Sequence, residues 1–214
     1  MMRTKVVTPA VGHVLTIETC RQQLELVAID GNSDGESHPD DDLILAMLDA
    51  AVEHAEAFTG LSIAIRTYEG ALDELPRLVA GDPTTSSIID LPHPPLIELI
   101  SFTTGDGSDV VDVDADTYIV DEYGDSTRLR PVTSWLAVAN SPNTVRIQYK
   151  AGYSSEGVGD TDATELPGAI RAAVLLMMAH LYESREDAVE KAMSTIPNGF
   201  EALLRPRRVL TGLA

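Results

Sequence analysis

The sequence lacks the residues on which several classes of protein depend. It has one cysteine, Cys20, which excludes an internal disulfide. Only 15 of its 214 residues are Lys or Arg, against 34 Asp or Glu, and the formal net charge of −19 disfavours binding of nucleic acid through its phosphates. No run reaches about 18 apolar residues, so no membrane-spanning helix is expected. The first ten residues include Arg3 and Lys5 but no apolar stretch, so no secretory signal is expected.

Motifs of the common enzyme classes are missing as well. There is no G-x-S-x-G, no G-x-G-x-x-G and no P-loop, and the five histidines have no metal-ligand spacing. Asp112, Asp114 and Asp116 alternate with apolar residues and would lie on one face of a strand, where a metal-dependent hydrolase could use them. A solvated strand face is the simpler interpretation. We therefore expect neither an enzyme nor a cofactor.

The charge that is present is distributed unevenly. Residues 30–62 contain nine acidic residues and no Lys or Arg, whereas residues 198–214 contain Glu201 and three arginines. An acidic body with a basic C-terminal segment indicates that this segment meets a different environment, although ordinary solvation explains most charge runs.

Two helices are predicted in the N-terminal quarter. Thr16 can cap the first, whose apolar stripe consists of Ile17, Cys20, Leu24 and Val27. The second is predicted over 40–59, because acidic residues occupy its first turn and Gly60 can end it in a left-handed conformation.

A third helix, predicted from Pro167, is apolar around nearly its whole circumference. Residues 169–181 are interrupted only by Arg171 and His180. A surface helix of one small domain needs an apolar stripe on one side only. The other side must therefore be covered either by the rest of the fold or by a neighbouring subunit, and the sequence leaves both open. A last short helix is predicted from Asn198.

Between the second and third helices the pattern changes to short extended runs. After the alternating segment that starts at Ser62, these runs are Ile88–Leu91, Leu96–Thr104, Tyr118–Val120, Thr127–Pro131 and Thr144–Ala151. Turn residues separate them, which predicts an antiparallel β unit with Trp135 as a packing anchor.

The predicted fold class is α+β, a small helical bundle made of two N-terminal helices and the C-terminal helices, with an inserted antiparallel β unit. The expected boundaries are 14–62 and 165–208 for the helical domain, 63–153 for the β domain, and 1–13 and 209–214 for flexible ends.

The loop between the first two helices contains the best local match to a metal site. Residues 30–35 read D-G-N-S-D-G, like the start of a calcium loop in which alternate oxygens surround one cation. The match then weakens, because Pro39 occupies position ten and the short Asp41 position twelve. An acidic loop that caps the second helix is the simpler interpretation. The alternative function is a calcium-binding helix–loop–helix module with the candidate ligands Asp30, Asn32, Asp34 and Asp41.

In its order of segments the chain resembles the head–tail connector (head-completion adaptor) proteins of tailed bacteriophages, in the version with a β insertion between the helices. The segments that carry the resemblance are Asp40–Ile44, Ala55–Gly60, Leu91–Leu96, Tyr118–Asp121, Val145–Tyr153, Leu166–Arg171, Ala179–Glu186 and Pro197–Leu204. It covers roughly residues 14–208 and rests on order and spacing rather than on one motif. Loop 30–37 and residues 154–163 depart from the pattern.

The resemblance implies a structural virion protein. Such adaptors form a ring, expected to be a dodecamer, that joins the portal protein of the head to a tail or stopper protein and extends the DNA channel. DNA would pass the acidic surface without specific binding. The expected localisation is the head–tail interface of the virion, and the host cytoplasm during assembly, with no role for a membrane.

The resemblance also implies roles for two parts of the C-terminal region. The third helix would pack between subunits through Ile170, Val174, Met177, Met178 and Leu181. The C-terminal segment would dock on the portal as an arm made of Phe200, Leu203, Leu204, Arg205, Arg207 and Arg208.

Overall fold

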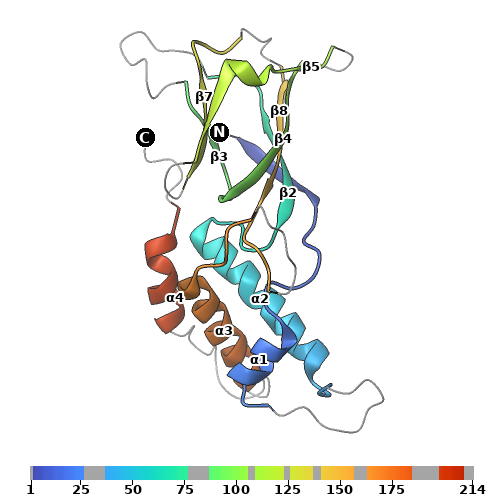
Figure 1. Cartoon of the computed structure of the whole chain (residues 1–214), viewed down its shortest axis with the longest axis vertical. Coiled ribbons are helices and arrows are strands. Elements are labelled where there is room, and N and C mark those ends of the chain that lie inside the picture. Colours follow the sequence, from blue (N-terminus) through green and yellow to red (C-terminus); the bar gives the residue numbers. More distant parts are fainter. Residues whose placement is uncertain are drawn as a thin grey trace.

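The computed structural model describes residues 2–26, 37–76, 87–105, 109–122, 126–136, 141–156, 163–184 and 198–209. Figure 1 shows helices at one end of an elongated molecule and strands at the other. The architecture is α+β, as predicted. No helix in these ranges is long and apolar enough to cross a membrane.

The helices at the lower end of Figure 1 are α1 (Ile17–Gln23), α2 (Asp41–Thr59), α3 (Gly168–Glu183) and α4 (Asn198–Leu204). The Thr16 hydroxyl caps α1 by accepting a hydrogen bond from the Thr19 amide at 3.3 Å, as expected. Gly60 ends α2 with a φ of 77°, which glycine adopts without steric cost. Val27, placed on the first helix from sequence, lies outside the described residues.

The strands form two antiparallel sheets. The five-stranded sheet has the order β1-β2-β8-β4-β5, and the three-stranded sheet the order β3-β7-β6. Their bounds are β1 Arg3–Thr8, β2 Arg66–Leu72, β3 Ile89–Leu91, β4 Leu96–Thr104, β5 Val111–Asp112, β6 Tyr118–Asp121, β7 Thr127–Pro131 and β8 Val145–Ala151. The inward residues of both sheets share one core, in which Phe102 packs against Trp135 with ring centroids 5.7 Å apart.

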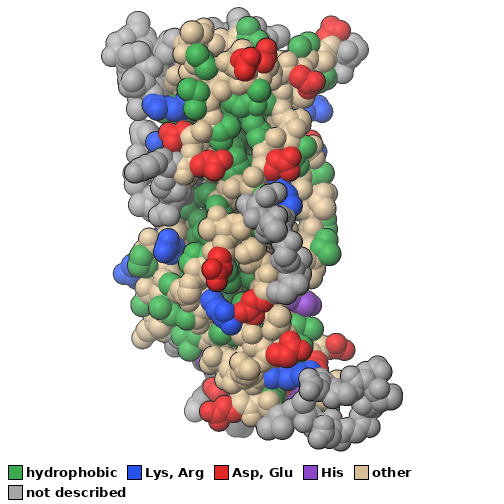
Figure 2. Space-filling model, in the orientation of Figure 1, with side chains coloured by type: hydrophobic (Ala, Val, Ile, Leu, Met, Phe, Trp, Pro, Cys, Tyr) green, Lys and Arg blue, Asp and Glu red, His purple; other side chains and the backbone are tan. Residues whose placement is uncertain are grey.

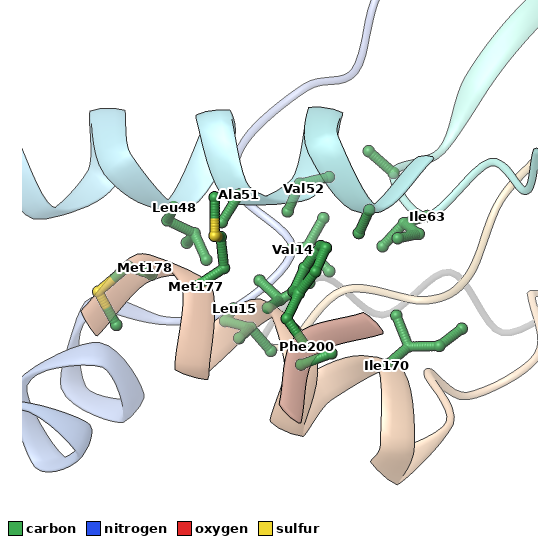
Figure 3. Packing of buried hydrophobic residues seen from close by; sticks show 14 of the residues in the cluster. Val14, Leu15, Leu48, Ala51, Val52, Ile63, Ile170, Met177, Met178 and Phe200 are labelled. Atoms are coloured by element: carbon green, nitrogen blue, oxygen red, sulfur yellow. The ribbon is translucent and has the colours of Figure 1, made fainter. Parts of the chain in front are cut away.

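The helical end has a separate core. Figure 3 shows buried side chains of α2 and α3 directed toward one another, with Phe200 of α4 and Val14 and Leu15 of the N-terminal segment between them. Ile63 and Ala64 also belong to this core rather than to the β core. The described residues therefore form two hydrophobic cores, one at each end of the molecule.

Two boundaries differ from the prediction. Residues 1–13 were expected to be a flexible end, but β1 within them pairs with β2 from Arg3 opposite Ala71 to Val6 opposite Tyr68. The strand expected from Ser62 begins only at Arg66. The reason is the Glu56 carboxylate, which accepts hydrogen bonds from the Ile63 and Ala64 amides at 2.8 and 3.0 Å and holds this segment outside the ladder.

The acidic strand face expected at Asp112, Asp114 and Asp116 is absent from this part of the structure. Strand β5 ends at Asp112, and Asp114 instead caps a 3-10 turn over Ala115–Thr117 by accepting from the Asp116 amide at 3.1 Å. The three carboxylates therefore do not line one strand, and within the described ranges no group of three or more His, Cys, Asp or Glu side chains could hold a metal ion.

Candidate functional site

The apolar surface of α3 is covered largely within its own chain. Ile170, Val174 and Met178 are fully buried in the helical core, and Met177 is nearly so. The covering elements are α1 and α2, together with α4. Helix α4 comes so close that a Cβ added to Gly199 would lie 3.1 Å from the Leu176 side chain. The prediction that these four residues form a subunit interface is therefore wrong for the folded chain, and Leu181 is half-buried against the same core.

The C-terminal segment also contributes to this core. The Phe200 ring lies 5.1 Å from the His54 ring and 6.4 Å from the Phe58 ring, measured between centroids. Phe200 and Leu204 are fully buried, and Leu203 is half-buried against the core. The portal-docking role expected for Phe200 and Leu204 needs correction, because a side chain that fills its own core is not available to a partner.

Three arginines of this segment remain on the surface: Arg205, Arg207 and Arg208. We call Arg205–Arg208 the cationic turn. It is held in place because the Val209 amide donates to the Thr59 carbonyl at 2.7 Å, and because the Arg208 guanidinium lies 5.6 Å from the Phe58 ring centroid. A turn with three positive charges thus lies fixed at the end of α2 in a strongly acidic protein.

A hollow of about 270 Å³ lies beside the cationic turn. Its lining combines Arg207 with residues from both ends of the molecule, namely Leu61, Pro94, Pro95, Leu96, Glu122, Thr127, Tyr153, Thr164 and Pro167. It therefore marks the boundary between the helical end and the β unit, next to the basic side chains.

The acidic loop between α1 and α2 is the site of the calcium hypothesis. Asp30, Asn32 and Asp34 lie outside the described residues. Both carboxylate oxygens of Asp41 are engaged by Arg21, whose Nε donates to Oδ1 at 2.8 Å and whose Nη2 donates to Oδ2. These hydrogen bonds hold the pKa of Asp41 below its usual range. The structure thus shows Asp41 in an ion pair that ties α2 to α1, a different role from the candidate calcium ligand of the alternative function.

Buried and half-buried polar groups join the two ends of the molecule. Glu56 of α2 pairs with Arg66 of β2 at 2.5 Å, and the Tyr68 hydroxyl lies 2.9 Å from the Ser62 hydroxyl. His93 stacks on Tyr68 at 4.7 Å, and burial lowers its pKa, so that it is neutral at neutral pH. These groups pair or stack with one another, which makes the junction a structural connection. Glu56, Arg66, Tyr68 and His93 also line a hollow of about 370 Å³ between α2 and β1.

Cys20 belongs to the helical core, as its place on the stripe of the first helix predicts. Burial, reinforced by the charges of Glu156 and Glu18, raises its pKa to about 11. At neutral pH it is therefore a protonated thiol with little nucleophilic character.

The β unit carries exposed apolar side chains that the sequence pattern does not reveal. They are Val6, Val7, Ile100, Val110, Val111, Ile119, Val132 and Leu136. Strand alternation can reveal such residues only when the buried face is known, and for β1 and β5 the pairing partners were not predicted.

No protein-family model and no curated protein matches the chain. Solved structures do match. A chain in the neck of an empty gene transfer agent particle, computed with C6 symmetry, superposes with a TM-score of 0.71 at 23% identity, over 98% of both chains. A chain in the virion of the native gene transfer agent particle gives a TM-score of 0.70 at 23% identity, again over 98% of both. The native neck computed with C12 symmetry gives 0.66 at 22% identity over the same shares. This chain therefore shares its fold with each of these three matched chains over nearly the whole length of both.

Proposed function

We propose that this chain is a structural subunit of the neck of a phage-like particle, an adaptor that joins the portal of the head to the tail or to a stopper protein. The observation that carries the proposal is the match over 98% of both chains to a protein of a gene transfer agent neck, with a TM-score of 0.71. Because the match includes both the helical end and the β unit, it concerns the whole arrangement and not one common motif.

As an adaptor, the chain acts in a closed ring around the DNA channel, with twelve copies as the expected number. The net charge of −19 supports this role, because DNA phosphates are repelled by an acidic surface and can slide past it. The ring belongs to the virion at the head–tail interface, and its subunits are made in the host cytoplasm during head completion.

The cationic turn is the part of the C-terminal segment that we propose docks on the portal. Arg205, Arg207 and Arg208 are exposed, and the Val209–Thr59 hydrogen bond and the core residues of α4 hold the turn in one place. An acidic groove or the carboxyl end of a helix on the portal would be the complementary surface.

The experiment is co-assembly with the portal protein encoded in the same genome, followed by negative-stain electron microscopy. The wild-type chain is compared with the triple variant Arg205→Glu, Arg207→Glu and Arg208→Glu. A matched control carries Arg128→Glu and Arg130→Glu, two exposed arginines of β7. Deleting the C-terminal segment is unsuitable, because it would remove Phe200 and Leu204 from the helical core.

We expect a ring of wild-type and control subunits on the portal, and its loss in the triple variant. A ring that survives in the triple variant would keep the adaptor function and place the portal contact elsewhere. Failure of the wild-type chain to bind the portal would overturn the proposed function.

A further inference from the structure

We propose that the two edges of the five-stranded sheet form the contact between neighbouring copies, with β5 of one copy paired to β1 of the next. This inference rests on the proposed ring, since it names the surfaces through which that ring would close. A cyclic ring needs two different, complementary surfaces on opposite sides of each subunit. In the order β1-β2-β8-β4-β5, the first and last strands are two such surfaces.

Both edge strands are little covered by their own chain. Five of the six residues of β1 are exposed, and so are both residues of β5. Val6 and Val7 are 49% and 43% exposed. Among the described strands, each of the two is paired on one side only, so its other side presents backbone groups that no described strand pairs with. Figure 1 shows β5 at the upper end of the molecule, at the margin of the sheet.

The two edges carry opposite charge. β1 contributes Arg3 and Lys5, which together with Arg146 of β8 line a hollow of about 360 Å³. Arg3 pairs with Asp73 at 2.5 Å and Lys5 pairs with Glu69 at 2.7 Å. Both side chains of the first pair are exposed, and so is Lys5, whereas Glu69 is half-buried. Exposed pairs exchange partners at little cost.

The opposite edge is acidic. Residues 109–117, which include β5 and the turn after it, contain four acidic residues and no Lys or Arg. These four, Asp109, Asp112, Asp114 and Asp116, are all exposed. Figure 2 shows acidic side chains at this upper end of the molecule.

The sheet register relates the two charges to each other. Arg3 is paired with Ala71, Ala71 with Arg146, Arg146 with Thr103, and Thr103 with Asp112, so that one row crosses all five strands. Paired residues lie on the same face of a sheet, so Arg3 and Asp112 are the two ends of a row on one face. If β5 pairs with β1 of the next copy along this row, Asp112 lies beside Arg3 of that copy.

The number of strands in the sheet determines the relative direction of β5 and β1 at the proposed contact. All neighbours in the five-stranded sheet are antiparallel, so β1 and β5 run in the same direction. Copies related by rotation around a ring would therefore form a parallel β5–β1 pair. A second copy fits better than DNA, because DNA could bind the basic edge but would leave the acidic edge without a partner.

The test uses cysteine cross-linking in the portal-bound ring. A chain with Arg3→Cys and Asp112→Cys is assembled on the portal and treated with a short bismaleimide. Lys5 and Asp114 keep their charges, and Cys20 is buried. We expect a ladder of covalent multimers. The control, Arg130→Cys with Asp112→Cys, replaces a residue of the other sheet and should give no ladder.

Charge reversal provides a second measurement. Arg3→Asp with Lys5→Asp should abolish the ring, and so should Asp112→Lys with Asp114→Lys, while circular dichroism shows that each variant folds. An equimolar mixture should restore rings, because every interface between unlike chains again joins opposite charges. Failure of the mixture to restore rings after each variant alone has lost them would overturn the pairing.

The outcomes separate this interface from the proposed function. A ring on the portal without a ladder would overturn the interface and leave the adaptor function standing. Cross-links from position 3 or 112 to the portal, a tail protein or DNA would overturn a second copy as the occupant. Absence of any ring of wild-type chain on the portal would overturn both.

Discussion

The helical end and the β unit differ in how completely each buries its apolar side chains. In the described residues, Leu43 is the only exposed large apolar side chain on a helix. Those of the strands and their connections include Ile100, Val111, Ile119 and Leu136. The helical end therefore satisfies its hydrophobic surface by itself, whereas the β unit leaves part of it to solvent or to another molecule.

This difference changes where contacts between subunits are expected. The strongly apolar α3 suggested an interface, but α2 and α4 cover it. The β unit gave no such signal from its sequence, yet it has open sheet edges of opposite charge. Exposed valines on an edge strand, which is paired on one side only, therefore favour a contact surface more than a buried apolar helix does.

The largest expected effect is on the helical core. Phe200→Ala empties a fully buried site between α2 and α3 and should lower the free energy of unfolding by roughly 3–5 kcal/mol. Urea unfolding followed by circular dichroism at 222 nm reports the helices, and Trp135 fluorescence reports the β unit. The helical transition should move more than the Trp135 transition. Ala202→Ser, at an exposed position of the same helix, is the control. If both probes moved together, the two cores would unfold as one unit and the comparison would fail.

A matching change in the β core tests whether this core also unfolds separately from the helical core. Leu129 is fully buried in β7, and Leu129→Ala should cost about 3 kcal/mol through lost burial and a cavity. For this variant the Trp135 transition should shift to lower urea concentration by more than the helical transition. Arg130→Ala, the exposed neighbour, should leave both transitions in place. A larger shift of the helical signal than of the Trp135 signal would contradict separate cores.

A smaller effect is expected at the α1–α2 ion pair. The Arg21 side chain is only 8% exposed and that of Asp41 19%, so Arg21→Ala should cost roughly 2 kcal/mol at pH 7, less than a fully buried pair. Because the pKa of Asp41 is lower in the fold than the ordinary 3.8, this contribution is present above that value and is lost as the pH falls through the folded pKa.

Thermal unfolding from pH 7 to pH 2 checks this dependence. The difference in unfolding temperature between wild type and Arg21→Ala should be constant down to about pH 5 and should disappear in stronger acid. Arg3→Ala removes an exposed pair and should change stability by less than about 1 kcal/mol at any pH. A gap that widened in acid would show that Arg21 acts through something other than Asp41.

The smallest effect is expected for the exposed valine of β5. Val111→Ser should change the free energy of unfolding of the isolated chain by no more than about 0.5 kcal/mol, because Val111 is 63% exposed. Val145→Ser, at a fully buried position of the same sheet, should be clearly destabilising. Denaturant titration of both variants measures these free energies of unfolding. Equal losses of stability in the two variants would mean that Val111 contributes to the stability of the fold and is not a surface residue available to a partner.

Elements with local signals were predicted closely. The acidic first turn and Gly60 placed α2, while β4 at Leu96–Thr104 and β7 at Thr127–Pro131 have the predicted bounds. The signals that end or cap these elements come from residues next to them in the chain. The missed strand β1 has its partner between 59 and 68 residues away, and a short, mostly exposed segment carries no alternation that reveals such a partner.

The sequence by itself determined the α+β class, the acidic character, the caps of α1 and α2 and most strand positions, because these depend on neighbours in the chain. Only the tertiary structure decided that α4 returns to α3 and buries Phe200, that Arg21 engages Asp41, and which residues share a face of the sheet. The row from Arg3 to Asp112 draws one residue from each of five strands. Burial and charge pairing are properties of segments that meet in space, so local spacing does not specify them.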